Sequence, residues 1–400
     1  MTLIKSARNF VSFSLLLVSF VASADVWVSE NTWSQDYERR FADWVNTSVK
    51  EDIFSNPRSP WHGIKTDCAD AVYTIRIIFA YQNRLPVLWK NTEVSGEMMS
   101  EKMNKWDNLG EKARVIAFAN YVNEHTGTYT LANDTYPVFV SQKWVRPGSL
   151  YLQPKRKQIS YIPSVLSNGH VYIVKDVTAG GSVLYMGSTV PVAVRKLSTR
   201  YDNPFAPLKS DSGFRNWKWP QDYNRSSSSI EGYSLEQFSV VDFENKLEGG
   251  AGKIMKWNNW AQGKLMLRAA SLDEKLEQAL YNVCNQIRDR MGVVQEAQRA
   301  KQNNGGRCLR GSTWDDLSTP SRDKRLHEDF EKLRSLSGQK YKNWDMTSVS
   351  KHPKACRYEV TPGRMWDLVQ FFKWSSDWKT DPNYSVEGRW GLSSKMDCQN

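Results

Sequence analysis

One cysteine in this chain has the surroundings of a nucleophile. Cys68 follows Asp67, a residue type that commonly caps helices, and the apolar residues Val72, Ile75 and Phe79 then recur at helical spacing. A cysteine at a helix N-terminus feels the positive end of the helix dipole, which lowers the thiol pKa and favours the thiolate. The pattern therefore predicts a reactive thiol at the start of a helix.

A histidine further along the chain is the best base for this thiol. His170 follows Gly169 and begins the apolar run 170–174, which predicts a strand with the imidazole at its N-terminal end. In such a pair the histidine takes the thiol proton, the sulfur attacks an acyl carbon, and the backbone N–H of Cys68 helps to hold the oxyanion. The alternatives are that Cys68 is a small residue of the apolar core and that His170 is a structural residue hydrogen-bonded to a neighbouring side chain.

The surrounding elements that must position the pair read as an α+β arrangement. Aromatic residues spaced by three or four predict a helical segment within 25–60, and turn-rich β-sequences fill 136–194, with a hairpin turn at 178–181. Long apolar periodicity predicts a helix over 272–302, and 320–340 is helical and highly charged. Helix first and antiparallel strands later is typical of α+β proteins.

The N-terminus and the cysteines indicate export. Residues 1–24 carry a basic start, an apolar run and an Ala-Ser-Ala site, the pattern of a signal peptide. No later stretch is long and apolar enough for a transmembrane anchor. We therefore expect a soluble periplasmic or secreted protein. Four of the five cysteines lie in the last third and predict up to two disulfides of open connectivity, which leaves Cys68 as a free thiol.

The formal charge of +11 favours anionic partners. For an exported protein we expect peptidoglycan or another anionic envelope polymer, and no nucleic acid; the alternative is that the lysines serve solubility alone. The histidines are scattered without ligand spacing, so we expect no metal, and we predict no cofactor.

Three short stretches together resemble the papain-like cysteine hydrolases, and most closely the NlpC-type cell-wall peptidases. They are Asp67-Cys68 before small residues, the turn and strand Pro147-Gly148-Ser149-Leu150, and the histidine strand Gly169-His170-Val171-Tyr172-Ile173-Val174. The resemblance covers roughly residues 60–192. It implies a papain-like core, in which the nucleophile helix packs on an antiparallel sheet, and Cys68 and His170 as catalytic residues.

The third catalytic residue departs from the family pattern. Cys68-Ala69-Asp70 is closer to the transglutaminase-like branch of the same superfamily, but Gly187-Ser188-Thr189 lacks the aspartate of that branch. We take Ser188 as the first choice, beside Tyr185 and Asp176, to orient the imidazole. Asp67, Asp70 and Tyr185 are expected to support the site.

These inferences give a division of the chain and a function. The predicted parts are a signal peptide (1–24), an N-terminal helical segment (25–60), a catalytic domain (61–197) with an insertion near 92–145, a linker or long loop (198–240), and a mainly helical, disulfide-containing C-terminal region (241–400). The expected activity is that of an exported cysteine peptidase or amidase acting on peptidoglycan stems. The alternatives are a transglutaminase-like protein-modifying enzyme and a catalytically degenerate cell-wall-binding protein.

Overall fold

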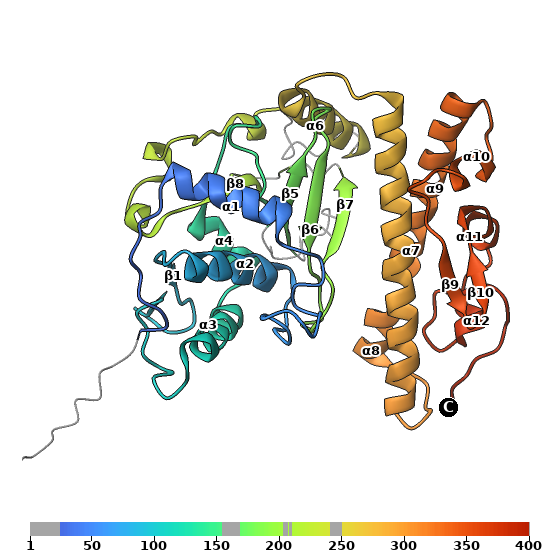
Figure 1. The fold of residues 1–400 in the computed structure, drawn as a ribbon, viewed down its shortest axis with the longest axis horizontal. Coiled ribbons are helices and arrows are strands. Elements are labelled where there is room, and N and C mark those ends of the chain that lie inside the picture. The colour runs from blue at the N-terminus through green and yellow to red at the C-terminus, as the bar shows by residue number, and fades with distance from the viewer. Residues whose placement is uncertain (1–24, 154–168, 203–206, 208–209, 241–249, 400) are drawn as a thin grey trace, which may run out of the picture.

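A computed structural model gives the fold shown in Figure 1 and describes residues 25–153, 169–202, 207, 210–240 and 250–399. Helices α1 to α4 and a six-stranded sheet form one side of the molecule, and helix α7 stands between this sheet and the rest of the C-terminal region (Figure 1). The expected signal peptide, residues 1–24, lies outside the described residues.

All neighbouring strands of the large sheet are antiparallel. In spatial order the strands are β3 (Thr135–Pro137), β8 (Gly213–Trp217), β4 (Leu150–Gln153), β5 (His170–Val177), β6 (Val183–Gly187) and β7 (Ser198–Asp202). Strand β8 therefore lies between β3 and β4, although the chain forms it last. A separate antiparallel pair joins β1 (Leu88–Lys90) to β2 (Met98–Ser100).

Helix α2 (Cys68–Gln82) covers one face of the sheet and is buried without interruption from Cys68 to Ala80. Alternate strand residues such as Leu152 and Val171 share its apolar core, which we call the α2-side core. The other helices of this part are α1 (Gln35–Thr47), α3 (Glu111–His125) and α4 (Thr128–Asp134). Buried Arg76 is neutralised by Glu38 at 2.5 Å. The ion pair lets a charged residue sit in the buried helix.

The opposite face of the sheet packs against helix α6 (Gly250–Leu265). Trp257 of α6 is fully buried, with its ring 5.8 Å from that of Tyr151, and its indole N–H donates to the carbonyl of Gln237 at 3.1 Å. We call this second apolar cluster the α6-side core. Three short 3-10 turns lie before α6: η1 (Pro220–Asp222), η2 (Ser227–Ser229) and η3 (Glu236–Phe238).

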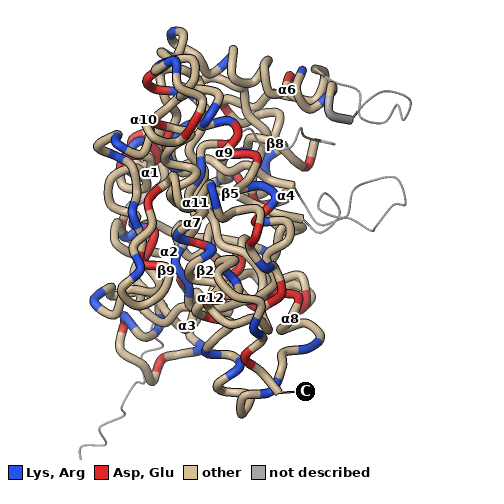
Figure 2. The backbone as a smooth tube through the Cα atoms, turned by 90° about the vertical axis from the view of Figure 1, so that its right-hand side faces the viewer, with Lys and Arg blue, Asp and Glu red and all other residues tan. Residues whose placement is uncertain are grey.

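The C-terminal region has its own core, built around α7 (Leu272–Asn303) and α9 (Pro320–Tyr341). Its remaining elements are α8 (Gly311–Leu317), α10 (Thr347–Ser350), β9 (Tyr358–Thr361), β10 (Arg364–Trp366), α11 (Leu368–Trp374) and α12 (Val386–Arg389). Two disulfides, Cys284–Cys356 and Cys308–Cys398, join α7 and the turn after it to later segments. On this side of the molecule the basic and acidic residues are interleaved (Figure 2).

Strand β7 fastens the C-terminal region to the sheet. Arg200 of β7 binds both carboxylate oxygens of Asp329 on α9, at 2.5 and 3.0 Å. The amide of Asn282 on α7 pairs with the backbone N–H and carbonyl of Tyr201, at 2.9 and 2.6 Å. These contacts are bidentate, so they fix orientation as well as position.

The structure confirms the prediction of an α+β fold with an antiparallel sheet, and of two disulfides in a mainly helical C-terminal region. It differs over 198–240, where β7 and β8 belong to the sheet instead of forming a linker. Both strands have only five residues and lie near prolines and serines, so the turn composition hides them. Among the described helices, none has the length and apolar composition needed to cross a bilayer.

We predict that Arg200→Met lowers the free energy of unfolding by about 3 kcal/mol, because it leaves the buried Asp329 without its cation. Urea denaturation measures the effect. The matched control is Arg39→Met, whose partner Asp36 lies at 3.2 Å on an exposed helix surface and whose loss should cost under about 0.5 kcal/mol. Equal effects of the two substitutions would contradict the anchoring role of Arg200.

Candidate active site

Helix α2 starts at Cys68 because Asp67 and Asp70 form a capping box. Asp67 is extended (φ −100°), and its carboxylate accepts hydrogen bonds from the N–H groups of Ala69 and Asp70, at 2.9 and 3.1 Å. The Asp70 carboxyl in turn accepts the N–H of Asp67 at 2.8 Å. Burial, with the charge of Asp67, raises the pKa of Asp70 to about 7. The two aspartates thus fix where the helix begins, and their expected support of catalysis stays a prediction.

Cys68 is a free cysteine, as the cysteine count predicts, and only 7 % of it is exposed. Its sulfur lies within hydrogen-bonding reach of the backbones of Ala69 and Val171. Burial raises the pKa of the thiol to about 12, and the carboxylate of Asp67 adds to the rise. The backbone N–H of Ala69 at the helix start lowers this pKa, which is the direction expected of the helix dipole, but desolvation and two nearby carboxyls outweigh it and the pKa as a whole is raised.

His170 is the first residue of β5, after Gly169 in a left-handed conformation (φ +73°). Its ring lies 4.3 Å from that of Tyr172, centroid to centroid. Burial, together with the positive charge of Arg325 on α9, lowers the pKa of His170 to about 4, against the charge of Asp67, which raises it. The imidazole is therefore neutral at pH 7 and able to accept a proton.

The thiol and the imidazole come from adjacent elements but are directed to different faces of the sheet. Cys68 belongs to the α2-side core together with Val171, whereas Tyr172 packs against the α6-side core. Side chains alternate along a strand, and the ring contact places His170 on the side of Tyr172. The structure thus brings the sulfur to the backbone of Val171, the residue next to His170, with both groups neutral.

The other expected site residues divide between the two faces. Ser188 lies on the side of Cys68, where its hydroxyl donates to the carbonyl of Thr66 at 3.1 Å and accepts from the Thr66 hydroxyl at 3.3 Å. Tyr185 is buried in the α6-side core, and burial raises its pKa well above the usual value. Asp176 accepts a hydrogen bond from Asn46 at 3.1 Å. The hydrogen bonds of Ser188 and Asp176 are thus made to residues other than His170.

Gln153 is a buried polar residue beside His170 that the sequence reasoning missed. It lies directly opposite His170 in the β4–β5 ladder, and paired residues of an antiparallel ladder project from the same face. Only 3 % of Gln153 is exposed, and neither its amide oxygen nor its amide nitrogen has a partner within the described residues. The polar residue Gln153 at the end of the apolar run Leu150-Tyr151-Leu152 was the available signal.

The C-terminal region adds charge to this site. Arg325 lies one turn before Asp329 on α9 and so projects on the same side of the helix. Asp329 is held by Arg200, which pairs with Tyr185 in the β6–β7 ladder. Arg325 is therefore carried toward the sheet face of His170, in agreement with its effect on the His170 pKa. Among the described residues, no cluster of three acidic, histidine or cysteine side chains could hold a metal ion.

Comparison with protein-family models, with curated proteins and with solved structures finds no match to this chain.

We predict that Cys68 of the folded protein reacts with iodoacetamide at neutral pH on the order of 10³-fold more slowly than an ordinary thiol, because so little of it is ionised. The rate should rise about tenfold per pH unit toward the thiol pKa. Asp67→Asn keeps a capping side chain but removes a charge, so it should accelerate labelling. Labelling of the unfolded, disulfide-intact protein is the control, and fast labelling of the folded protein would contradict the prediction.

Proposed function

We propose that the protein is an exported cysteine hydrolase, a peptidase or amidase, that cleaves peptide stems of cell-wall peptidoglycan and has a papain-like core of the NlpC type. The observation that carries the proposal is the setting of Cys68. It is a free cysteine at the first position of a capped helix, with its sulfur against the strand that His170 begins. The short sequence resemblance around both residues supports the choice of class.

The chemistry follows from a neutral thiol and a neutral imidazole. His170 takes the proton of the Cys68 thiol while the sulfur attacks the amide carbon, and the Cys68 N–H stabilises the oxyanion. The carbon–nitrogen bond then breaks, and the imidazolium gives its proton to the leaving amine. Water, deprotonated by the imidazole, hydrolyses the thioester and restores the thiol. An added amine in place of water would make the same site a transglutaminase-like enzyme.

The resting geometry sets one requirement for this reaction. His170 lies at the end of β5, and its imidazole must turn around the end of the sheet to reach the sulfur. We assign the orienting role to Gln153, the last residue of β4. Its amide oxygen has no partner among the described residues at rest and lies at the position paired with His170, and its side chain must follow the imidazole around the end of the sheet to accept the ring N–H. Ser188 remains a prediction for this role.

A second candidate function is a catalytically degenerate wall-binding protein. The observations that favour it are the raised pKa of Cys68 and the direction of the His170 ring. A buried thiol and a histidine on the other sheet face would then be remnants of a hydrolase site. Binding of sacculi without cleavage separates this function from the first.

We expect the mature chain, residues 25–400, to release peptide-cleaved products from purified sacculi. Cys68→Ala and His170→Gln should each reduce the rate by at least about 10²-fold. The control is His62→Gln, because His62 lies exposed in a loop. Mass analysis of the soluble and residual muropeptides measures the effect. Binding by wild type and Cys68→Ala without products would replace the hydrolase with the wall-binding protein, and products from Cys68→Ala would remove the thiol from the mechanism.

Gln153→Leu should lower kcat by about 10²-fold and change KM little, because it removes an acceptor from the base and not from the substrate. Gln153→Glu retains an oxygen and places a carboxylate beside the imidazole, so the acidic limb of the pH–rate profile should move to higher pH. A purely structural role would lower the activity of both variants and leave the profile in place. Thermal unfolding of both variants provides the stability control.

A further inference from the structure

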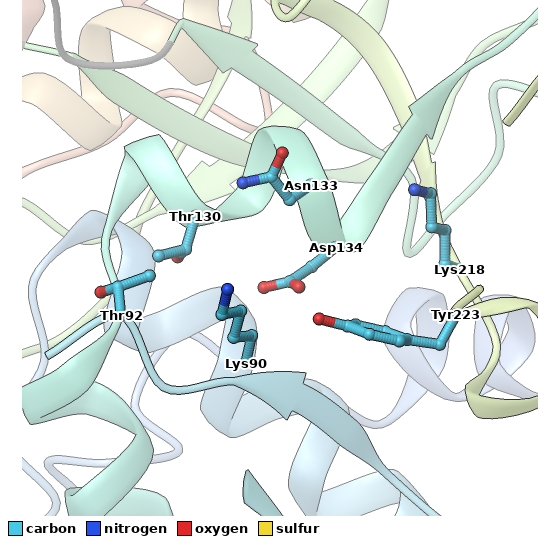
Figure 3. Close-up of a pocket in the computed structure, with 7 residues that line it drawn as sticks. All are labelled: Lys90, Thr92, Thr130, Asn133, Asp134, Lys218 and Tyr223. Atoms are coloured by element: carbon cyan, nitrogen blue, oxygen red, sulfur yellow. The ribbon is translucent and has the colours of Figure 1, made fainter. Parts of the chain in front are cut away.

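A hollow lies at the β3 edge of the sheet, away from Cys68. It has a volume of about 310 Å³ and is lined by Lys90, Thr92, Thr130, Asn133, Asp134, Lys218 and Tyr223 (Figure 3). These residues come from β1, from α4 and from the segments after β1 and β8. A water molecule occupies about 30 Å³ of liquid, so the hollow has room for an organic molecule and not only for a single ion.

Asp134 is the central group of this pocket. Only 4 % of it is exposed, and its Oδ2 accepts a hydrogen bond from the phenol of Tyr73 on α2. Oδ1 takes none of the hydrogen bonds found among the described residues. In Figure 3 the carboxylate points into the same space as the hydroxyl of Tyr223. Buried carboxylate oxygens normally accept hydrogen bonds, so the unpaired Oδ1 of Asp134 is available to a hydrogen-bond donor of a ligand.

The cations around Asp134 leave positive charge to spare. Lys90 and Lys218 line the pocket, and the charge of Lys218 acts on Asp134 without a salt bridge between them among the described residues. Buried Arg215 lies behind them, with its guanidinium bonded to the carbonyls of Ala132, Ser210 and Thr135. These bonds fix the pocket wall, and the charge of the guanidinium is met in part by Asp211, so the spare cations of the pocket are the two lysines. The pocket therefore offers the ammonium groups of Lys90 and Lys218 to an anionic group of a ligand, and the carboxylate of Asp134 to a hydrogen-bond donor of the same ligand.

We infer that this pocket binds a small organic ligand that carries both a carboxylate and an ammonium group, as an amino acid or a short peptide does. The ligand carboxylate is held by Lys90 and Lys218, and its ammonium group donates to Asp134. The hydroxyl of Tyr223 and the amide of Asn133 are available to a peptide group between these ends. The site does not depend on Cys68, because β3 and β8 are separated from β5 by β4.

The electrostatics of Asp134 give the site a pH dependence. Burial raises the pKa of Asp134 to about 7, against the bond from Tyr73 and the charge of Lys218. The other titratable groups of the pocket are Tyr223, whose pKa is raised, and Lys90, and the charge of Arg215 acts on Lys218. A ligand ammonium group stabilises the ionised carboxylate, so binding releases a proton and affinity rises with pH until the ligand amine itself deprotonates near pH 8.

The test is calorimetric titration of the mature, disulfide-intact chain with glycylglycine, acetate and methylamine. We expect glycylglycine to bind more tightly than either fragment, and its affinity to rise between about pH 5.5 and about pH 7.5. Lys90→Gln and Lys218→Gln should each weaken binding about tenfold. The control variant is Lys143→Gln, in which the lost lysine is 70 % exposed and lies outside the pocket.

Two results would overturn the inference. Acetate bound as tightly as glycylglycine, with affinity that falls as pH rises, would show a simple anion site. No heat with any probe at millimolar concentrations, or no loss in the two lysine variants, would show that the pocket is not a binding site. The same titration with Cys68→Ala keeps this outcome distinct from the proposed hydrolase, because the variant should bind glycylglycine normally.

Discussion

The burial of helix α2 against the antiparallel sheet is the constraint on which the molecule depends. Thirteen successive side chains of this helix, Cys68 to Ala80, are buried, so the helix has no free face and its start cannot drift. The capping box of Asp67 and Asp70 sets that start, and the ion pair with Glu38 neutralises Arg76, the buried cation of this helix. Cys68, at the first position, and Tyr73, one and a half turns later, therefore have fixed positions in two separate polar sites.

This same burial explains why the site is neutral at rest. The helix dipole lowers the pKa of Cys68, whereas the carboxyls of the helix cap raise it. Exclusion of water also raises this pKa, so the protonated thiol is the favoured form. His170 is left uncharged by the same exclusion, and Arg325 of the C-terminal region adds to it. The C-terminal region is thus electrostatically part of the site, since Arg200 and Asp329 hold α9 against the sheet.

The local elements could be read from the sequence because their signals are local. The α7 helix, predicted over 272–302, ends at Asn303, and the hairpin turn at 178–181 joins β5 to β6. The number of disulfides followed from the even number of cysteines in the last third of the chain. What the sequence could not give depends on distant contacts, such as the pairing of Gln153 with His170 and the desolvation of Cys68. Alternation along β5 was readable, but the face that α2 covers was not, so the direction of the imidazole was missed.

The position of β8 has a consequence for how the chain can be divided. Because β8 lies between β3 and β4, the sheet is interrupted until residues 213–217 have been made. A fragment that stops at residue 197 would leave the facing edges of β3 and β4 without partners, and unpaired strand edges invite aggregation. The segment 61–197 is therefore no self-contained module that recombination could move by itself, and a fragment that carries the whole sheet must extend at least to the end of β8.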